Sequence, residues 1–127
     1  MMVAGIGCRS GATSDAVAAA IAAALDRCNL ARTQIDALAT AIDKSAEPGI
    51  AGAARSLGLR LIFVSPAEMR ATTGGTLTSS ARVESLKGVP SVAETAALAA
   101  AGRGARLLAP RIATATVTCA IAVGGAP

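Results

Sequence analysis

Short apolar runs separated by alanine-rich segments dominate the first half of the chain. Three of these runs have the length and branched-residue content of buried strands. They are Val3–Gly7, Ile35–Ile42 and Leu59–Val64. Each is bounded by glycine, proline or polar residues, so the pattern predicts three buried strands rather than one long helix.

A helical segment with a recognisable start follows each of these runs. Thr13 or Ser14 is placed to cap the first helix, and Pro48 suits the first turn of the second, which Gly58 ends. Ser65 is placed to cap a short third helix. Because strands and helices alternate, the strands are expected to be parallel and joined by right-handed crossovers.

The pattern changes in the second half of the chain. Residues Thr72–Pro90 are rich in Gly, Ser and Thr and predict a long loop. Ser91 and Glu94 then have the spacing of a capping box, which predicts a fourth helix. Two further runs, Ala105–Pro110 and Thr114–Val123, are joined too tightly for a crossover helix and therefore predict antiparallel strands.

These elements together predict the α/β class. We expect a three-layer α/β/α sandwich whose mixed five-stranded, mostly parallel sheet has an antiparallel last strand. The 127 residues suit a single domain, 1–127. Hydrophobic residues make up 53% of the chain, yet it has one Phe and neither Tyr nor Trp, so small side chains must let the helices approach the sheet closely.

Charge and composition narrow the range of possible functions. A net charge of +4 suits an acidic ligand, while the lack of a basic run or stacking aromatics disfavours nucleic acid. The absence of His excludes imidazole ligation and a Ser-His-Asp triad, and the three cysteines form no CxxC pair. We expect neither metal nor organic cofactor. Without a signal peptide or an apolar stretch of about 20 residues, we expect a cytoplasmic protein that does not contact a membrane.

The carboxyl ends of the predicted parallel strands bring charged residues to one edge of the sheet, where open α/β sheets bind ligands. Arg9 follows the first strand, and Asp43, Lys44 and Glu47 follow the second. The turn around Arg9 also carries the glycines of a G-x-G-x-x-x-G pattern. Helix N-termini at the same edge favour negative charge, so this edge predicts a site for carboxylates or phosphates.

Each of these features also has a structural explanation. The glycines could serve only a tight turn, Arg9 could be a solvated charge, and the residues after the second strand could form a local surface ion pair. Ser65, Ser91 and Glu94 could be helix caps and nothing more. A dinucleotide site is disfavoured, because the glycine spacing departs from G-x-G-x-x-G and Asp43 comes too late to bind a ribose.

Four stretches of the sequence together carry a family resemblance. They are GIGCRSG, ATAIDKSAEPGI, GVPSVAETAAL and TVTCAIA. In combination they resemble the CobE / CbiG C-terminal-domain family of cobalamin biosynthesis, over nearly the whole chain. CbiG-type proteins carry additional N-terminal domains, whereas this chain begins almost directly at its first strand, so it looks like the stand-alone CobE form.

The resemblance implies a role in the corrin-ring pathway, whose intermediates bear many acetate and propionate groups. The implied partners are a corrinoid or precorrin intermediate and other enzymes of the pathway. The implied ligand-binding positions are Gly7, Cys8, Arg9, Gly11, Asp43, Lys44, Ser91 and Glu94. Gly5, Glu47 and Gly49 also match the family pattern.

Three functions remain open at this point. The first is a non-catalytic protein that binds or carries a corrin intermediate. The second is a hydrolase that opens a precorrin δ-lactone with loss of acetaldehyde, with Glu47, Asp43 or Glu94 as general base; Cys8, near a helix N-terminus and Arg9, is a possible nucleophile of lowered pKa. The third is a nucleotide-binding module, which rests on the glycine-rich turn alone.

Overall fold

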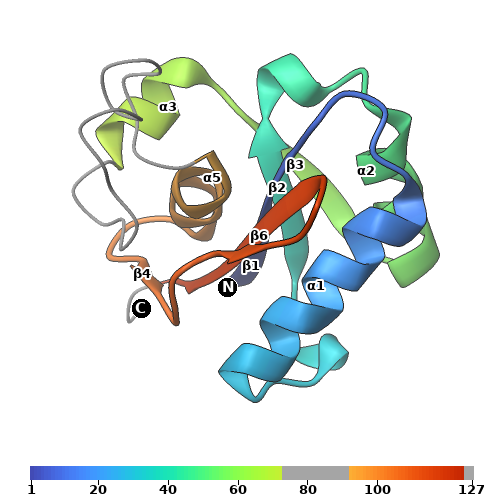
Figure 1. Cartoon of the computed structure of the whole chain (residues 1–127). Coiled ribbons are helices and arrows are strands. Elements are labelled where there is room, and N and C mark those ends of the chain that lie inside the picture. The colour runs from blue at the N-terminus through green and yellow to red at the C-terminus, as the bar shows by residue number, and fades with distance from the viewer. Residues whose placement is uncertain (73–91, 125–127) are drawn as a thin grey trace.

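A computed structural model describes residues 1–72 and 92–124 of the chain (Figure 1). The strands are β1 (Met2–Cys8), β2 (Ala37–Ala41), β3 (Arg60–Val64), β4 (Arg106–Leu107), β5 (Ile112–Ala113) and β6 (Val117–Val123). The α-helices are α1 (Ser14–Cys28), α2 (Pro48–Leu57), α3 (Pro66–Ala71) and α5 (Val92–Ala101). Two 3₁₀ turns, η1 (Arg32–Gln34) and η2 (Ile42–Lys44), complete the described elements.

The strands form one mixed sheet in the order β3-β2-β1-β6-β4, with β5 also paired to β6. β1, β2 and β3 are parallel, and β6 runs antiparallel to β1, β4 and β5. This confirms the α/β class and the antiparallel last strand predicted from the sequence.

The sheet has six strands rather than the expected five, because Ile112–Ala113, between the two predicted runs, also pairs with β6. The predicted strand Ala105–Pro110 is shorter than expected. β4 ends at Leu107, and pairing with β6 resumes only at Ile112. Pro110 lies in the interruption and has no N–H to donate to the ladder, which explains why this edge strand breaks into two short pieces.

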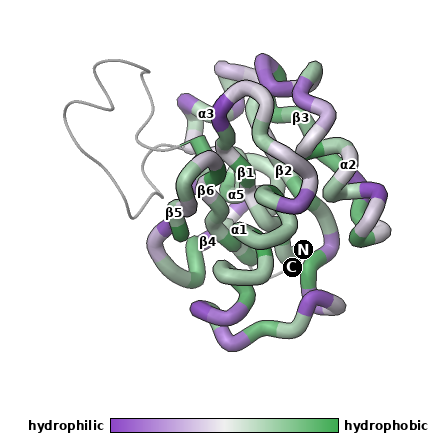
Figure 2. The backbone as a smooth tube through the Cα atoms, turned by 45° about the vertical axis from the view of Figure 1, so that its right-hand side comes forward, coloured by the Kyte–Doolittle hydropathy of each residue, from purple (hydrophilic) through white to green (hydrophobic). Residues whose placement is uncertain are grey.

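Helices cover both faces of the sheet. α1 and α2 lie on one face, and α3 and α5 lie on the other (Figure 1). β6 contributes the larger groups Val117, Cys119 and Ile121 to the α1 side and the small groups Ala120 and Ala122 to the α5 side. Apolar segments concentrate in the middle of the molecule and polar ones at its periphery (Figure 2). The alternation expected from the sequence therefore builds two different cores.

Small residues allow α5 to lie directly on β1. A Cβ added at Gly5 would collide with the carbonyl oxygen of Ala93 and would lie 2.8 Å from the Cβ of Ala97. Ala93, Ala96 and Ala97 are all fully buried. The scarcity of aromatic residues thus has a structural purpose, since bulkier side chains would push this helix off the sheet.

The helix ends largely follow the sequence signals. The Thr13 hydroxyl accepts a hydrogen bond from the Ala16 N–H at 3.0 Å, and Ser65 forms a capping box with Glu68. Gly58 adopts a positive φ of 70° at the end of α2. The predicted cap at Ser91 and the predicted loop Thr72–Pro90, apart from Thr72 itself, lie outside the described residues.

Candidate functional site

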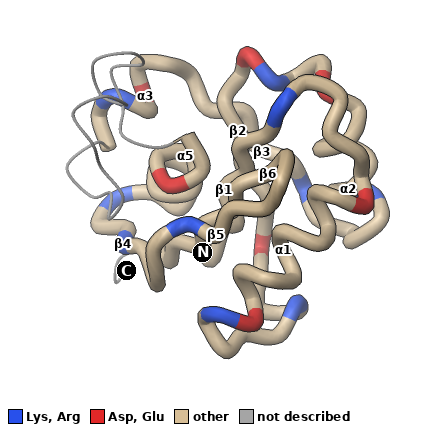
Figure 3. The backbone as a smooth tube through the Cα atoms, in the orientation of Figure 1, with Lys and Arg blue, Asp and Glu red and all other residues tan. Residues whose placement is uncertain are grey.

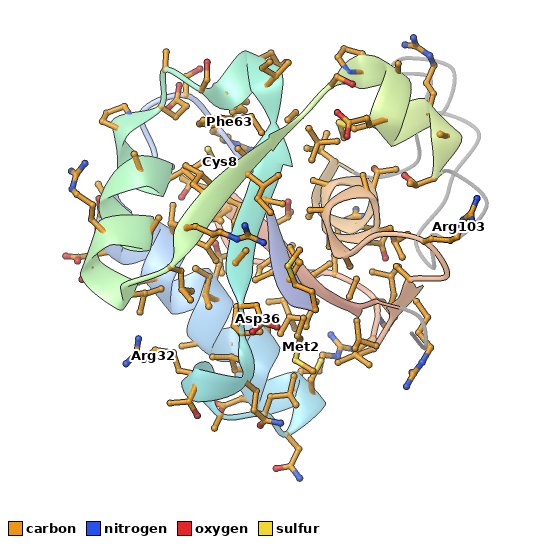
Figure 4. All side chains as sticks on the ribbon, turned by 180° about the vertical axis from the view of Figure 1, so that it is seen from behind. Met2, Cys8, Arg32, Asp36, Phe63 and Arg103 are labelled. Carbon is orange, nitrogen blue, oxygen red and sulfur yellow. The ribbon has the colours of Figure 1, made fainter. Side chains whose placement is uncertain are left out.

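The carboxyl ends of β1, β2 and β3 meet at one edge of the sheet because the three strands are parallel. Cys8 and Phe63 lie toward this edge, whereas Met2 and Asp36 lie at the opposite one (Figure 4). The connections that leave this edge carry both basic and acidic residues (Figure 3). The structure therefore brings the predicted loops after the first two strands to the same edge.

A hydrogen bond ties these two loops together. The backbone N–H of Gly11 donates to Oε1 of Glu47 at 2.9 Å, across 36 residues of sequence. On its other side the same loop is fixed by the Arg9 N–H, which donates to the carbonyl oxygen of Thr116 at 2.9 Å. We call the region formed by Cys8–Gly11 and Lys44–Glu47 the loop junction.

The glycines of the first turn have two different purposes. Gly11 has a φ of 83° and no atom within 4 Å of an added Cβ, so it supplies a left-handed turn at the exposed tip of the loop. A Cβ added at Gly7 would lie 2.7 Å from Oγ1 of Thr118 on β6 and 3.6 Å from the Cβ of Val92 on α5. Gly5 and Gly7 are therefore explained by close packing, and only Gly11 shapes the surface of the loop junction.

Cys8 lies within the loop junction, close enough to Lys44 and Glu47 for their charges to change its pKa. Partial burial raises the pKa of the Cys8 thiol, while Lys44 lowers that pKa and Glu47 raises it by smaller amounts. The sequence-based suggestion that a helix N-terminus and Arg9 lower this pKa is wrong, because loss of hydration outweighs the nearby positive charge. Cys8 is therefore a protonated thiol at neutral pH.

Asp43 belongs to η2 but, unlike Lys44, is not among the residues whose charges act on Cys8. Together with Ile42 it lines a cavity of about 320 Å³ between η2, α3 and the start of α5. We call this cavity the α3 pocket; its lining also includes Ala41, Val64, Met69 and Arg70. Neighbouring residues of one turn thus belong to two regions: Asp43 lines the pocket, and Lys44 lies at the loop junction.

Sequence reasoning missed Arg70 and Met69 as residues of this edge. Both belong to α3, which Ser65 and Glu68 start immediately after β3. Because α3 has only six residues, its last turn stays close to the carboxyl edge and carries Arg70 to the pocket. The short distance from Ser65 to Arg70 was the available signal.

Of the two predicted site residues at the fourth helix, Glu94 and Ser91, the structure describes only Glu94. Glu94 is fully buried on α5, with no exposed surface. Ser91 lies outside the described residues, so its implied role in ligand binding stays a prediction.

Within residues 1–72 and 92–124, no three His, Cys, Asp or Glu side chains gather as a metal-binding group. No helix in the same ranges is long and apolar enough to cross a bilayer.

Comparison with known proteins gives a consistent result. The family model described as "Cobalamin synthesis G C-terminus" matches residues 2–122. No curated protein sequence matches the chain significantly.

Three solved structures are similar over nearly the whole chain. The crystal structure of CobE, a protein from the cobalamin (vitamin B12) biosynthetic pathway, is 33% identical, with a TM-score of 0.87 over 96% of this chain and 89% of that one. The cobalamin biosynthesis protein chiG of Agrobacterium tumefaciens is 46% identical, with a TM-score of 0.79 over 99% of this chain and 100% of that one.

The third structure is a proposed cobalamin biosynthesis protein G homologue from Sulfolobus solfataricus. It is 26% identical, with a TM-score of 0.75, and the match covers 98% of this chain but 37% of that one. The shared domain is therefore part of a longer protein in that case. The extent of the family match and the two closer structural matches show that the chain belongs to the CobE / CbiG C-terminal family of cobalamin biosynthesis proteins.

Proposed function

We propose that this cobalamin biosynthesis protein binds an anionic corrinoid or precorrin intermediate at the carboxyl edge of its sheet and carries it without changing it. The observation that carries the proposal is the hydrogen bond from Gly11 to Glu47. It joins the loop that bears Arg9 to the turn that bears Lys44, so two cations follow neighbouring strands at one edge.

The chemistry of the ligand matches this arrangement. Corrin intermediates carry several acetate and propionate groups, and an exposed guanidinium such as that of Arg9 binds carboxylates with charge-assisted hydrogen bonds. Glu47 is an acid at the same place, but one of its oxygens already accepts the Gly11 N–H. This hydrogen bond partly offsets the negative charge of Glu47 and so weakens its repulsion of the ligand.

The alternative function is a hydrolase that opens a precorrin δ-lactone with loss of acetaldehyde. That reaction needs a general base or a nucleophile. The raised pKa of Cys8 disfavours a thiolate nucleophile, and Glu47 is engaged with Gly11. These two observations favour binding over catalysis, and they leave Asp43 and Glu94 as the acids to test for hydrolysis.

A titration with hydrogenobyrinic acid, followed by its visible spectrum and by co-elution in gel filtration, tests the binding proposal. We expect a saturable spectral shift and a complex that elutes together. An unchanged spectrum and separate elution would exclude this function.

Separate variants test the hydrolase alternative. Asp43→Asn, Glu47→Gln and Glu94→Gln should support normal corrin synthesis in cells if the protein is a carrier. A variant that still binds the corrinoid but stops synthesis would instead favour catalysis.

A further inference from the structure

We infer that the α3 pocket is a second part of the ligand site, which receives one carboxylate-bearing arm and the adjoining apolar ring edge of the corrinoid, with Arg70 as the cation. The inference rests on the proposed function, since it extends the same ligand from the loop junction into a cavity that sequence reasoning did not identify.

The size of the cavity sets how much of the ligand can enter. Its volume of about 320 Å³ is at the lower end of the range for small-molecule sites, which is roughly 300–1,000 Å³. A corrin macrocycle with all its acid side chains is larger than this. The pocket therefore accommodates one arm and the edge of the ring that bears it, while the rest of the macrocycle stays outside.

The lining of the pocket is apolar where a ring edge would contact it. Val64 and Met69 are 1% and 5% exposed and form its buried part, while Ile42 is 50% exposed at its rim. Covering a half-exposed Ile beside a cavity lowers the free energy by about 25 cal/mol for each Å² of apolar surface removed from water. Met adapts its shape to a partner, so the methylated edge of a corrin suits this lining.

The charges at the pocket favour a single anionic arm. Arg70 contributes a positive charge to the lining, and a guanidinium attracts a carboxylate and can form charge-assisted hydrogen bonds with it. The first residue of α5, Val92, also lines the pocket, and that end of a helix favours negative charge. Asp43 shares the cavity and repels any carboxylate that enters, so Arg70 and the start of α5 offset this repulsion for one acid arm and not for several.

The position of η2 connects the pocket to the loop junction. Ile42 and Asp43 line the pocket, and Lys44, the next residue, lies close enough to Cys8 to alter its pKa. A ligand lying across η2 therefore reaches Arg70 on one side and Lys44 on the other. Two acid arms of one macrocycle can be held at once in this way.

The test compares two arginines in matched positions. Arg70 and Arg55 are both exposed and each is the basic residue in the last turn of its helix, but only Arg70 lines the pocket. Hydrogenobyrinic acid is titrated into the full chain and into the Arg70→Gln and Arg55→Gln variants. A fully amidated corrinoid, which presents the ring without its negative charges, is titrated in parallel.

We expect Arg70→Gln to weaken binding of the acid about 10- to 100-fold, the range of a charge-assisted contact, and Arg55→Gln to leave it within about twofold. The Arg70 effect should disappear with the amide. A second variant, Ala41→Leu, should weaken binding of both ligands because it fills the cavity.

Two outcomes would overturn the inference in distinguishable ways. If the unmodified protein binds hydrogenobyrinic acid and both Arg70→Gln and Ala41→Leu bind it equally well, the pocket is no part of the site, although the proposed function stands. If the unmodified protein does not bind it, the proposed function fails and the inference fails with it.

Discussion

The two faces of the sheet differ in the residues that they place at the carboxyl edge. On the α5 face, glycine and alanine bring a helix onto β1, and the edge ends in an apolar cavity with Arg70 at its lining. On the α1 and α2 face, the edge ends in polar loops held together by the hydrogen bond from Gly11 to Glu47. One face thus offers shape and apolar surface, and the other offers backbone geometry and charge.

This difference shows how a chain without His or Tyr and with a single Phe can still build a selective site. Neither region alone combines an apolar surface with two cations. The turn η2 lies between them and contributes to both, so a ligand that is both apolar and polyanionic fits the edge as a whole.

The largest effect is expected from bulk at the interface between β1 and α5. Gly5→Val should lower the free energy of unfolding by about 3 kcal/mol or more, because its side chain overlaps the backbone of α5. Gly11→Ala should cost only about 1 kcal/mol, since its Cβ meets open space and only the positive φ is unfavourable. Urea unfolding monitored by circular dichroism measures both, and equal costs would contradict the contrast between the faces.

The second prediction concerns the cations of the loop junction. Arg9→Ala and Lys44→Ala should each weaken hydrogenobyrinic acid binding by about 1–3 kcal/mol, the loss of one charge-assisted contact. Arg27→Ala is the control, because this exposed arginine lies in the last turn of α1 and not at the loop junction. Calorimetric titration gives the affinities. If Arg27→Ala weakens binding as much as Lys44→Ala does, general charge and not the loop junction attracts the ligand.

The third prediction separates the hydrogen bond of Glu47 from its charge. Glu47→Ala should cost about 1 kcal/mol of stability and weaken corrinoid binding, because the Gly11 N–H loses its acceptor. Glu47→Gln keeps an oxygen acceptor and removes a negative charge, so it should bind the polyanion at least as tightly as the unmodified protein. Thermal unfolding and titration of both variants test this, and weaker binding by Glu47→Gln would refute it.

The smallest effect is expected in the titration of Cys8. Its raised pKa predicts slow alkylation at neutral pH, with a rate that rises with pH and reaches half its maximum only above the ordinary thiol pKa of about 8.5. Lys44→Ala should raise this pKa further and slow alkylation, whereas Glu47→Gln should lower the pKa and speed alkylation. Peptide mass spectrometry after iodoacetamide labelling at several pH values follows the site.

Cys28 provides the control in the same molecule. Burial raises its pKa as well, but its charged neighbour is Arg27, and neither Lys44 nor Glu47 contributes to the shift. Its alkylation rate should be the same in all three proteins. Equal rates at Cys8 in all three would show that the loop junction is wider than described.

Much of the fold followed from local signals. The helices starting at Ser14, Pro48 and Pro66 were predictable because caps and prolines fix the start of a helix within a few residues. The predicted strand ended at Pro110, and β5 was not predicted because two residues are too few to show an alternating pattern.

The site was predictable only in part. The carboxyl-edge rule brought Arg9 and Lys44 to one edge, since it depends on strand direction alone. It did not reveal that Asp43 lines a pocket while the charge of Lys44 acts on Cys8, nor that Arg70 of α3 lines the same pocket, because these depend on how one turn and one short helix pack. The hydrogen bond from Gly11 to Glu47 likewise joins positions whose sequence spacing carries no signal.

If a corrinoid binds at the carboxyl edge, across η2, its contacts should appear in the backbone amide spectrum. The experiment adds hydrogenobyrinic acid to ¹⁵N-labelled protein and maps the amide shifts. We predict that the largest shifts fall on Cys8–Gly11, on Ile42–Glu47 and on Arg70, while Asn29–Ala31 and Leu57–Leu59 at the opposite edge stay unchanged. Shifts centred on the opposite edge, or none at a saturating concentration, would contradict the account.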